Sequence, residues 1–429
     1  MRRTLFTTAL TASVLALSLN ACSPKAQNKA KTQDHENNSN PVATASAHTT
    51  TGKALHHKMD VTLSPSAHTL SATDTITIPA QLAHNGLQFL INADLEVEKT
   101  SGEVNFKLVA ENRNADDLGM DRDNDSADSI IKVDVYEVSG LTEGADNTIT
   151  LSLEGMINNP VKQLGEEYAR GFSSSPGLIE DRGVYLAGAT YWVPTVEDSL
   201  ITYELDVTLP AGWSSVSQGA RALNADENST HHDRWNAPTP TEEIYVIGAE
   251  FTQYEMPVGN VTAMAYLRTP DEAMANKYLE TTAQYMEMYR GLVGPYPYTK
   301  FALVENFWET GYGMPSFTLL GSQIIRFPFI LHSSYPHELL HNWWGNSVYI
   351  DFETGNWAEG LTAYMADHLV AEQRGTGAEY RRAILQRYTN YVDDSTDFPL
   401  KEFTGRTDAP TEAVGYGKTS MVFDMLREK

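Results

Sequence analysis

SSYPHELLHNWWGNSVYIDFETGNWAEGLTAY, residues 333–364, is the stretch of this sequence that decides its fold and chemistry. His337 and His341 are four positions apart, so a helix would place both imidazoles on one face, where they can share one ion. Glu338 follows the first histidine and can reach a water on that ion. Zinc accepts imidazole nitrogen and carboxylate oxygen, and a catalytic zinc site needs a third protein ligand. Glu359 is the candidate for that ligand, on a second helix packed against the first.

The alternative is an amphipathic helix with histidine and glutamate on its surface. The motif is flanked by Leu339, Leu340, Trp343 and Trp344, which predicts that most of this helix is buried. Buried histidines and a buried glutamate need polar partners, because their desolvation otherwise costs free energy. A metal ion supplies such a partner. We therefore expect one zinc ion per chain, held by the two histidines and Glu359.

The chain begins with a segment that has the order of an export signal. Arg2 and Arg3 are followed by Leu5–Leu19, an uncharged and mostly apolar run, and then by Cys22, the single cysteine. This order resembles a bacterial lipoprotein signal, in which the cysteine is lipidated and becomes the new N-terminus. The segment 1–22 therefore predicts export and a membrane anchor, in the outer membrane and facing the periplasm or the cell surface. Ordinary secretion with an incidental cysteine is the alternative.

Composition limits the class of protein and of partner. The chain has 429 residues, 41% of them hydrophobic, which is typical of a globular protein with a large core. Its formal net charge of -25 argues against nucleic acid as the main partner, because phosphate binding needs concentrated Lys and Arg. Residues 23–55 are small or polar with almost no large apolar side chains, so we predict a flexible linker there.

The remaining chain divides into two predicted domains, an N-terminal β domain at 56–260 and a catalytic domain at 261–429. Residues 201–209 alternate between apolar and polar side chains, as a half-buried strand does. Three further runs have a similar strand pattern: HTLSATDTITIP (68–79), NTITLSLEG (147–155) and EEIYVIGAEF (242–251). A helix-start pattern, with Thr269 as the cap, then opens a mostly helical region with a few strands.

Several separate stretches resemble one known family, the zinc aminopeptidases typified by aminopeptidase N. They are GPYPYTKFALVEN (294–306), HELLHNWWGN (337–346), NWAEGLTAY (356–364) and YGKTSMVFDML (416–426). The β-rich part, 58–267, also resembles the N-terminal β domain of that family. The resemblance implies a β-sandwich-like domain followed by a thermolysin-like, mostly helical zinc domain. It also implies hydrolysis of peptides, with release of their N-terminal residues.

The resemblance also assigns roles to single residues. It makes His337, His341 and Glu359 the zinc ligands and Glu338 the general base that acts on a water. The hydroxyl of Tyr416 would stabilise the oxyanion that forms on the peptide carbonyl. In the stretch Tyr312-Gly313-Met314-Pro315-Ser316, the resemblance implies that Gly313 and Met314 line the substrate.

The sequence departs from the family pattern in three places. The spacing between His341 and Glu359 is one residue shorter than the family usually has. Pro315 stands where the family has the glutamate that grips the free α-amine of the substrate, and Glu309 is a nearby substitute. The family continues with a helical domain that caps the cleft, whereas this sequence stops 13 residues after Tyr416.

These departures leave alternatives open. Pro315 motivates a zinc endopeptidase, or another hydrolase on the same fold. A catalytically idle binding lipoprotein that keeps the metal for stability is a different class, disfavoured by Glu338 and Tyr416, which are not needed to hold zinc. On the last predicted helix, Met421, Val422, Met425 and Leu426 form an apolar stripe. We expect either a missing C-terminal domain or a second copy of the chain to cover it.

Overall fold

The computed structural model describes residues 54–115, 131–163, 173–197 and 199–429. The predicted signal segment with Cys22 lies outside these ranges, as does the predicted linker up to residue 53. The first strand begins at Leu55, the last residue of that predicted linker. These described residues form one compact unit. Among the described residues, none of the helices has the length and hydrophobicity needed to span a membrane.

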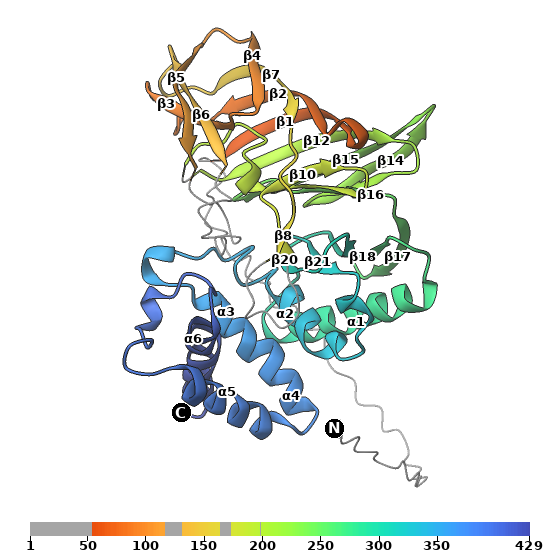
Figure 1. Cartoon of the computed structure of the whole chain (residues 1–429), viewed down its shortest axis with the longest axis vertical. Coiled ribbons are helices and arrows are strands. Elements are labelled where there is room, and N and C mark those ends of the chain that lie inside the picture. Colours follow the sequence, from red (N-terminus) through yellow and green to blue (C-terminus); the bar gives the residue numbers. More distant parts are fainter. Residues whose placement is uncertain (1–53, 116–130, 164–172, 198) are drawn as a thin grey trace, which may run out of the picture. The chain divides into compact units, whose positions relative to one another are not determined.

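The first part of the described chain is built from strands. They are β1 (Leu55–Ser64), β2 (Thr69–Ile78), β3 (Leu87–Asn92), β4 (Leu95–Ser101), β5 (Asn105–Asn114), β6 (Lys132–Ser139), β7 (Asn147–Met156), β8 (Lys162–Gln163), β9 (Ser173–Ser174), β10 (Gly177–Glu180), β11 (Gly183–Leu186), β12 (Ile201–Pro210), β13 (Ser214–Val216), β14 (Ala220–Glu227), β15 (Thr230–Thr241) and β16 (Val246–Ala249). Within the described ranges, the largest sheet has the order β14-β15-β12-β1-β2-β7-β4, and the next has the order β10-β11-β16-β13 (Figure 1). Two smaller sheets have the orders β3-β6-β5 and β8-β9.

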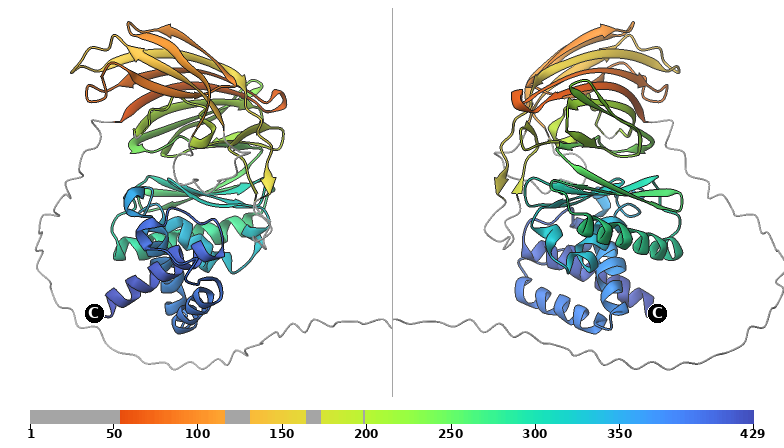
Figure 2. Two further views of the ribbon diagram at one scale, coloured as in Figure 1. Left: turned by 60° about the vertical axis from the view of Figure 1, so that its left-hand side comes forward. Right: turned by 90° about the vertical axis from the view of Figure 1, so that its right-hand side faces the viewer.

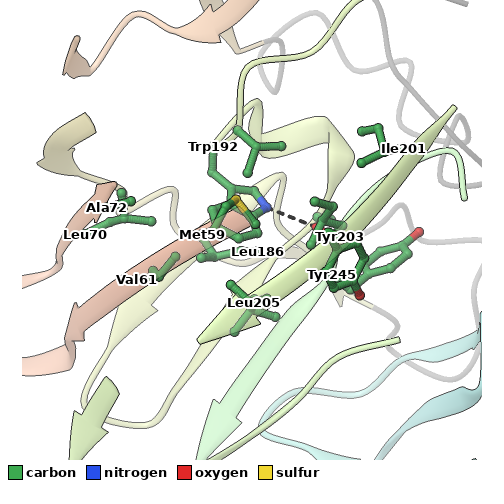
Figure 3. Packing of buried hydrophobic residues seen from close by; sticks show 14 of the residues in the cluster. Met59, Val61, Leu70, Ala72, Leu186, Trp192, Ile201, Tyr203, Leu205 and Tyr245 are labelled. Carbon is green, nitrogen blue, oxygen red and sulfur yellow. Dashed lines mark hydrogen bonds between the residues drawn. The ribbon is translucent and has the colours of Figure 1, made fainter. Parts of the chain in front are cut away.

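Alternating side chains bury one face of the largest sheet, as the sequence predicts. Along β12, buried residues alternate with half-exposed ones, and β12 pairs in parallel with β1. Side chains from both strands pack against Leu186 and Trp192 (Figure 3). The indole Nε1 of Trp192 donates a hydrogen bond to Ile244 O at 3.0 Å, which satisfies the polar atom of this buried ring. The predicted strands at 68–79 and 147–155 are confirmed by β2 and β7.

A mixed sheet follows, with the strand order β17-β18-β19-β21-β20 among the described residues. Its strands are β17 (Thr252–Val258), β18 (Val261–Leu267), β19 (Lys300–Asn306), β20 (Gly311–Met314) and β21 (Phe317–Gly321). Helix α1 (Glu272–Leu292) connects β18 to β19 and lies along one face of this sheet (Figure 2). Strand β20 is at the end of the strand order, so one of its edges is not paired within the sheet.

The predicted start of helix α1 was wrong by two residues. Asp271, not Thr269, caps the helix, because its side chain accepts a hydrogen bond from Met274 N at 2.9 Å. Aspartate caps helices at least as well as threonine, and here its carboxylate has the reach to the third helical N–H.

The helices of the second half follow the mixed sheet. They are α2 (Ser334–Leu340), α3 (Trp357–Thr362), α4 (Leu369–Gln373), α5 (Gly377–Tyr391), α6 (Ala409–Glu412) and α7 (Thr419–Arg427), with π-helical turns η8 (Ala363–His368) and η10 (Ala413–Lys418). Short 3-10 turns are η2 (Pro65–Ala67), η4 (Gly188–Thr190), η5 (Ile324–Arg326), η6 (Ile330–His332), η7 (Phe352–Thr354) and η9 (Leu400–Glu402). The description "mostly helical" for 261–429 therefore fits only the part after β21. The mixed sheet begins with β17, before the predicted domain boundary at 260/261, which stays a prediction.

Candidate metal centre

Helix α2 carries His337 and is fixed in position because it is buried, which determines where both motif histidines lie. Leu339 and Leu340 are fully buried and hold the helix against the core. The helix ends at Leu340. His341 continues its last turn, because His341 N donates a hydrogen bond to His337 O at 3.2 Å. The two imidazoles consequently lie on one side of the helix, with ring centroids 4.8 Å apart.

Helix α3 brings Glu359 to the same place. Its cap residue, Asn356, accepts a hydrogen bond from Glu359 N at 3.4 Å. Asn356 also donates through its backbone N–H to Phe403 O at 2.6 Å and through its side chain to Thr404 O at 3.0 Å. The shortened spacing after His341 therefore leaves the start of α3 firmly held.

His337, His341 and Glu359, which we call the metal cluster, offer ligand atoms that all lie within 4.8 Å of one another. The Nδ1–H of His337 donates to Asp367 Oδ2 at 3.0 Å, and the Nδ1–H of His341 donates to Trp344 O at 3.0 Å. The acceptors at Nδ1 leave the Nε2 lone pairs for the cluster, and metal-binding histidines are usually oriented in this way. Each Nε2 faces Glu359 Oε2, at 3.3 and 3.4 Å.

This donor set fits a metal ion for two reasons. Two imidazole lone pairs that face a carboxylate oxygen repel it unless a cation or a proton lies between them. Moreover, bonds of about 2.0–2.2 Å in a tetrahedral zinc site put neighbouring ligand atoms roughly 3.3–3.5 Å apart. The separations of 3.3 and 3.4 Å from Nε2 to Oε2 agree with that value.

The electrostatics of the metal cluster show strong coupling between its acids and bases. Burial by itself lowers the pKa of His337, but Asp367, Glu359 and Glu338 outweigh it and raise that pKa well above its usual range. Burial would raise the pKa of Glu359, yet the two histidines hold it well below its usual range. A carboxylate that stays ionised among buried imidazoles is the condition that a cation site requires.

Glu338 lies beside the metal cluster and touches the end of strand β20. A Cβ atom built on Gly313 would lie only 2.7 Å from Glu338 Oε2, so glycine is what allows this close approach. The backbone O of Gly313 also accepts a hydrogen bond from Asn346 Nδ2 at 3.2 Å. Burial raises the pKa of the Glu338 carboxyl, although both histidines oppose that rise. The Glu338 carboxylate therefore takes up a proton more readily than an exposed glutamate does, as a general base must.

Tyr416 lies on η10, opposite α2, with its ring 6.2 Å from the His337 ring and nearly parallel to it. Two glycines permit this arrangement. A Cβ on Gly360 would meet Thr419 Cγ2 at 2.2 Å, and a Cβ on Gly415 would meet the Phe403 ring at 2.2 Å. These close approaches seat α3 against Thr419 at the start of α7 and η10 against Phe403, and the Tyr416 ring lies beside His337 of the metal cluster.

The residues predicted to line the substrate differ in their exposure. Gly313 is partly exposed beside Glu338, whereas the Met314 side chain is 2% exposed and packs in the core. Strand β20 can therefore offer a substrate only the backbone of Met314. Pro315 is buried as well. The carboxylate of Glu309, the suggested substitute for the missing amine ligand, accepts hydrogen bonds from Gln323 N at 2.9 Å and Ile324 N at 3.3 Å.

Sequence reasoning missed Asp367, the partner of His337. It lies eight residues after Glu359 and, in a regular helix of 3.6 residues per turn, would be rotated by about 80° from it around the helix axis. The π-helical turn η8 adds about one residue to a turn, so one α turn and one π turn together span roughly eight residues. This turn places Asp367 two turns above Glu359, and a sequence pattern does not mark it.

Sequence reasoning also missed a buried group of Lys300, Ser316 and Asn342, which we call the lysine cluster. Lys300 is 1% exposed, and its Nζ donates to Ser316 Oγ at 2.7 Å and Ser316 O at 3.2 Å. Ser316 N in turn donates to Asn342 Oδ1 at 2.7 Å, in the residue that follows His341. The cluster thus ties the β20–β21 turn to the end of α2.

Comparison with known proteins identifies the fold. Protein-family models give no match, and neither do the curated proteins. Among solved structures, the chain is similar to an M1 zinc metallopeptidase from Deinococcus radiodurans and to a mutant of it bound to the substrate Tyr-Ser-Ala. In both cases the TM-score is 0.60 and the identity 16%, over 87% of this chain and 83% of the other. The fold is therefore that of the M1 zinc metallopeptidases.

Proposed function

We propose that this protein is a zinc-dependent metallopeptidase with a thermolysin-like catalytic part. The observation that carries the proposal is the spacing of the metal cluster, whose Nε2 and Oε2 atoms lie 3.3 and 3.4 Å apart. The fold is in agreement, because similar solved structures are zinc metallopeptidases. His337, His341 and Glu359 would hold one zinc ion per chain, and Asp367 would orient His337.

The residues around the metal cluster can each take one role in peptide hydrolysis. A bound zinc ion would polarise the peptide carbonyl and make a water more acidic. The Glu338 carboxylate takes a proton from the attacking water and passes it to the amine of the leaving group, so the proton balance closes. The Tyr416 hydroxyl donates a hydrogen bond to the oxygen that becomes negative. The edge of β20 that faces away from β21 can align an extended peptide by backbone hydrogen bonds.

Within this class, aminopeptidase activity is our leading proposal, because the similarity in sequence motifs is to zinc aminopeptidases. A specific observation favours the alternative of a zinc endopeptidase. Pro315 cannot bind an α-amine, and the Glu309 carboxylate already accepts two backbone hydrogen bonds. Such a site can bind a peptide whether or not the peptide has a free α-amine, as an endopeptidase does.

One experiment tests the proposed function and separates its two forms. The purified protein is incubated with a mixed library of free and N-acetylated peptides, with and without a zinc chelator, and the cut positions are mapped by mass spectrometry. Removal of N-terminal residues from free peptides alone supports the aminopeptidase. Internal cuts in acetylated peptides support the endopeptidase. No chelator-sensitive cleavage in either set would contradict the proposal and leave an idle metal-bound protein.

We further propose that the protein is exported and anchored through a lipid on Cys22, which would make a bacterial membrane its second partner beside peptides. The support is the order of charged, apolar and small residues in segment 1–22. Fractionation of cells that express wild type or Cys22→Ala tests the anchor. Recovery of both proteins in the soluble fraction would refute lipidation.

A further inference from the structure

A cation lies over the ring of Tyr416. The Arg406 Cζ atom is 5.6 Å from the centroid of that ring, within the range of cation–π contacts. The Arg406 side chain is 31% exposed, so it is shielded from water over most of its length. The Phe403 ring meets the Tyr416 ring edge-on, with centroids 5.9 Å apart. Tyr416 is consequently held by contacts from a segment that precedes η10.

The same segment is fastened to the metal-binding helix. Asn356, the cap of α3, donates hydrogen bonds to the backbone oxygens of Phe403 and Thr404. Arg406 follows two residues later, and its guanidinium lies 4.0 Å from Glu412 on α6. The position of Arg406 is thus linked both to the helix that carries Glu359 and to the turn that carries Tyr416.

We propose that Arg406 is a positioning residue that acts through Tyr416. It holds the phenol ring at the angle where the hydroxyl meets the oxyanion. Its positive charge over the ring also makes the Tyr416 hydroxyl a stronger hydrogen-bond donor to the negative charge that develops. This inference rests on the proposed peptidase function and assigns Arg406 no contact with the substrate.

The test is a double-mutant cycle with Arg406→Met and Tyr416→Phe. Kinetics are measured on a peptide that the wild-type protein cleaves, and binding is measured by calorimetry with a phosphinic peptide that mimics the oxyanion. Arg406→Met should lower kcat on the order of tenfold with KM nearly unchanged. It should weaken phosphinate binding to a similar degree. In the Tyr416→Phe background the same change should have little further effect, because the residue through which Arg406 acts is already altered.

Two control variants separate this role from a general loss of structure. Arg406→Lys keeps a cation near the ring and should recover part of the lost kcat. Arg387→Met removes the other arginine that pairs with Glu412. Because this arginine does not contact Tyr416 and an exposed ion pair contributes little, kcat should stay within about twofold of the wild-type value. All variants should retain the wild-type zinc content and thermal midpoint within a few degrees.

The outcomes are distinguishable. Additive losses in the double variant would overturn the role through Tyr416. A rise in KM confined to substrates with a free C-terminal carboxylate would overturn it too, because Arg406 would then bind the substrate directly. If the wild-type protein neither cleaves peptides nor binds the phosphinate, the proposed function fails, and the role of Arg406 fails with it.

Discussion

The metal cluster and the lysine cluster are both buried, yet different forces stabilise the two clusters. They are adjacent in the sequence, because His341 belongs to the metal cluster and Asn342 to the lysine cluster. In the lysine cluster, donors face acceptors: Lys300 Nζ donates to Ser316, and Ser316 N donates to Asn342. In the metal cluster, two imidazole lone pairs face a carboxylate. The first arrangement is complete in itself, whereas the second needs a cation or a proton between the imidazole nitrogens and the carboxylate.

This difference separates structural from functional burial of polar groups. A buried polar group is tolerated when it is hydrogen-bonded, and a buried ionic group when it is paired or binds metal. Changes in the metal cluster and its neighbours should therefore alter metal binding or turnover. Changes in the lysine cluster should instead alter how stability depends on pH.

The largest expected effect is on turnover, in Glu338→Ala. Loss of a general base costs about 10²–10⁴ in rate, while zinc content and fold should be preserved because Glu338 is not a ligand. Peptide hydrolysis and metal content are measured on the same preparation. The exposed Glu353→Ala is the matched control and should behave as wild type. Normal turnover in the Glu338 variant would remove it from the chemistry.

The next effect is in Tyr416→Phe, which removes one hydroxyl. We expect a loss of about 10²–10³ in kcat, as for removal of one oxyanion donor, with zinc retained. Tyr388→Phe is a suitable control, because its ring also lies below a cation, Lys418 Nζ at 5.8 Å. Equal kcat values for the two variants would show that the role given to Tyr416 is wrong.

A smaller effect is expected on zinc affinity in Asp367→Ala. The change removes the acceptor that orients the His337 ring, and loss of such a partner weakens metal binding by about 10–100-fold. Competition with a chromogenic chelator measures the affinity. Asp397→Ala, which breaks an exposed pair with Lys418, is the control. An unchanged affinity in Asp367→Ala would mean that His337 needs no such support.

The smallest effect is expected for Lys300→Met. This change should alter the free energy of unfolding at neutral pH by about 1 kcal/mol or less. The acceptors on Ser316 keep other donors, since Gly219 N donates to its Oγ and Ala302 N to its O. Burial, helped by Arg221, holds the pKa of Lys300 well below its usual range.

The pH dependence of Lys300→Met has a defined sign. Above the depressed folded-state pKa, the unfolded chain binds a proton at Lys300 that the folded chain does not, up to about pH 10.4. Wild-type stability should thus rise with pH in this window, by up to about 1.4 kcal/mol per pH unit relative to Lys300→Met. Urea unfolding of both proteins between pH 7 and 10 measures the difference. Parallel pH profiles would show that Lys300 is charged in the folded protein.

The sequence predicts the centre of the site well because the relevant spacing is local. A separation of four residues places His337 and His341 on one helix face, and alternation along residues 201–209 identifies β12. Its periphery depends on features without a sequence pattern. A π turn brings Asp367 to His337, and the lysine cluster joins residues from three separate elements. The motif predicts that Met314 lines the substrate, and because its side chain is buried in the core, only its backbone is left for that role.

The central claim is that the metal cluster binds zinc, and the metal content of His341→Ala tests it most directly. Protein is purified without chelator, and zinc per chain is measured by mass spectrometry for wild type, Lys300→Met and His341→Ala. We predict about one zinc ion per chain in the first two proteins, and loss of the ion in His341→Ala, with all three folded by circular dichroism. Full retention of zinc by His341→Ala, or its absence from wild type after reconstitution, would contradict the account.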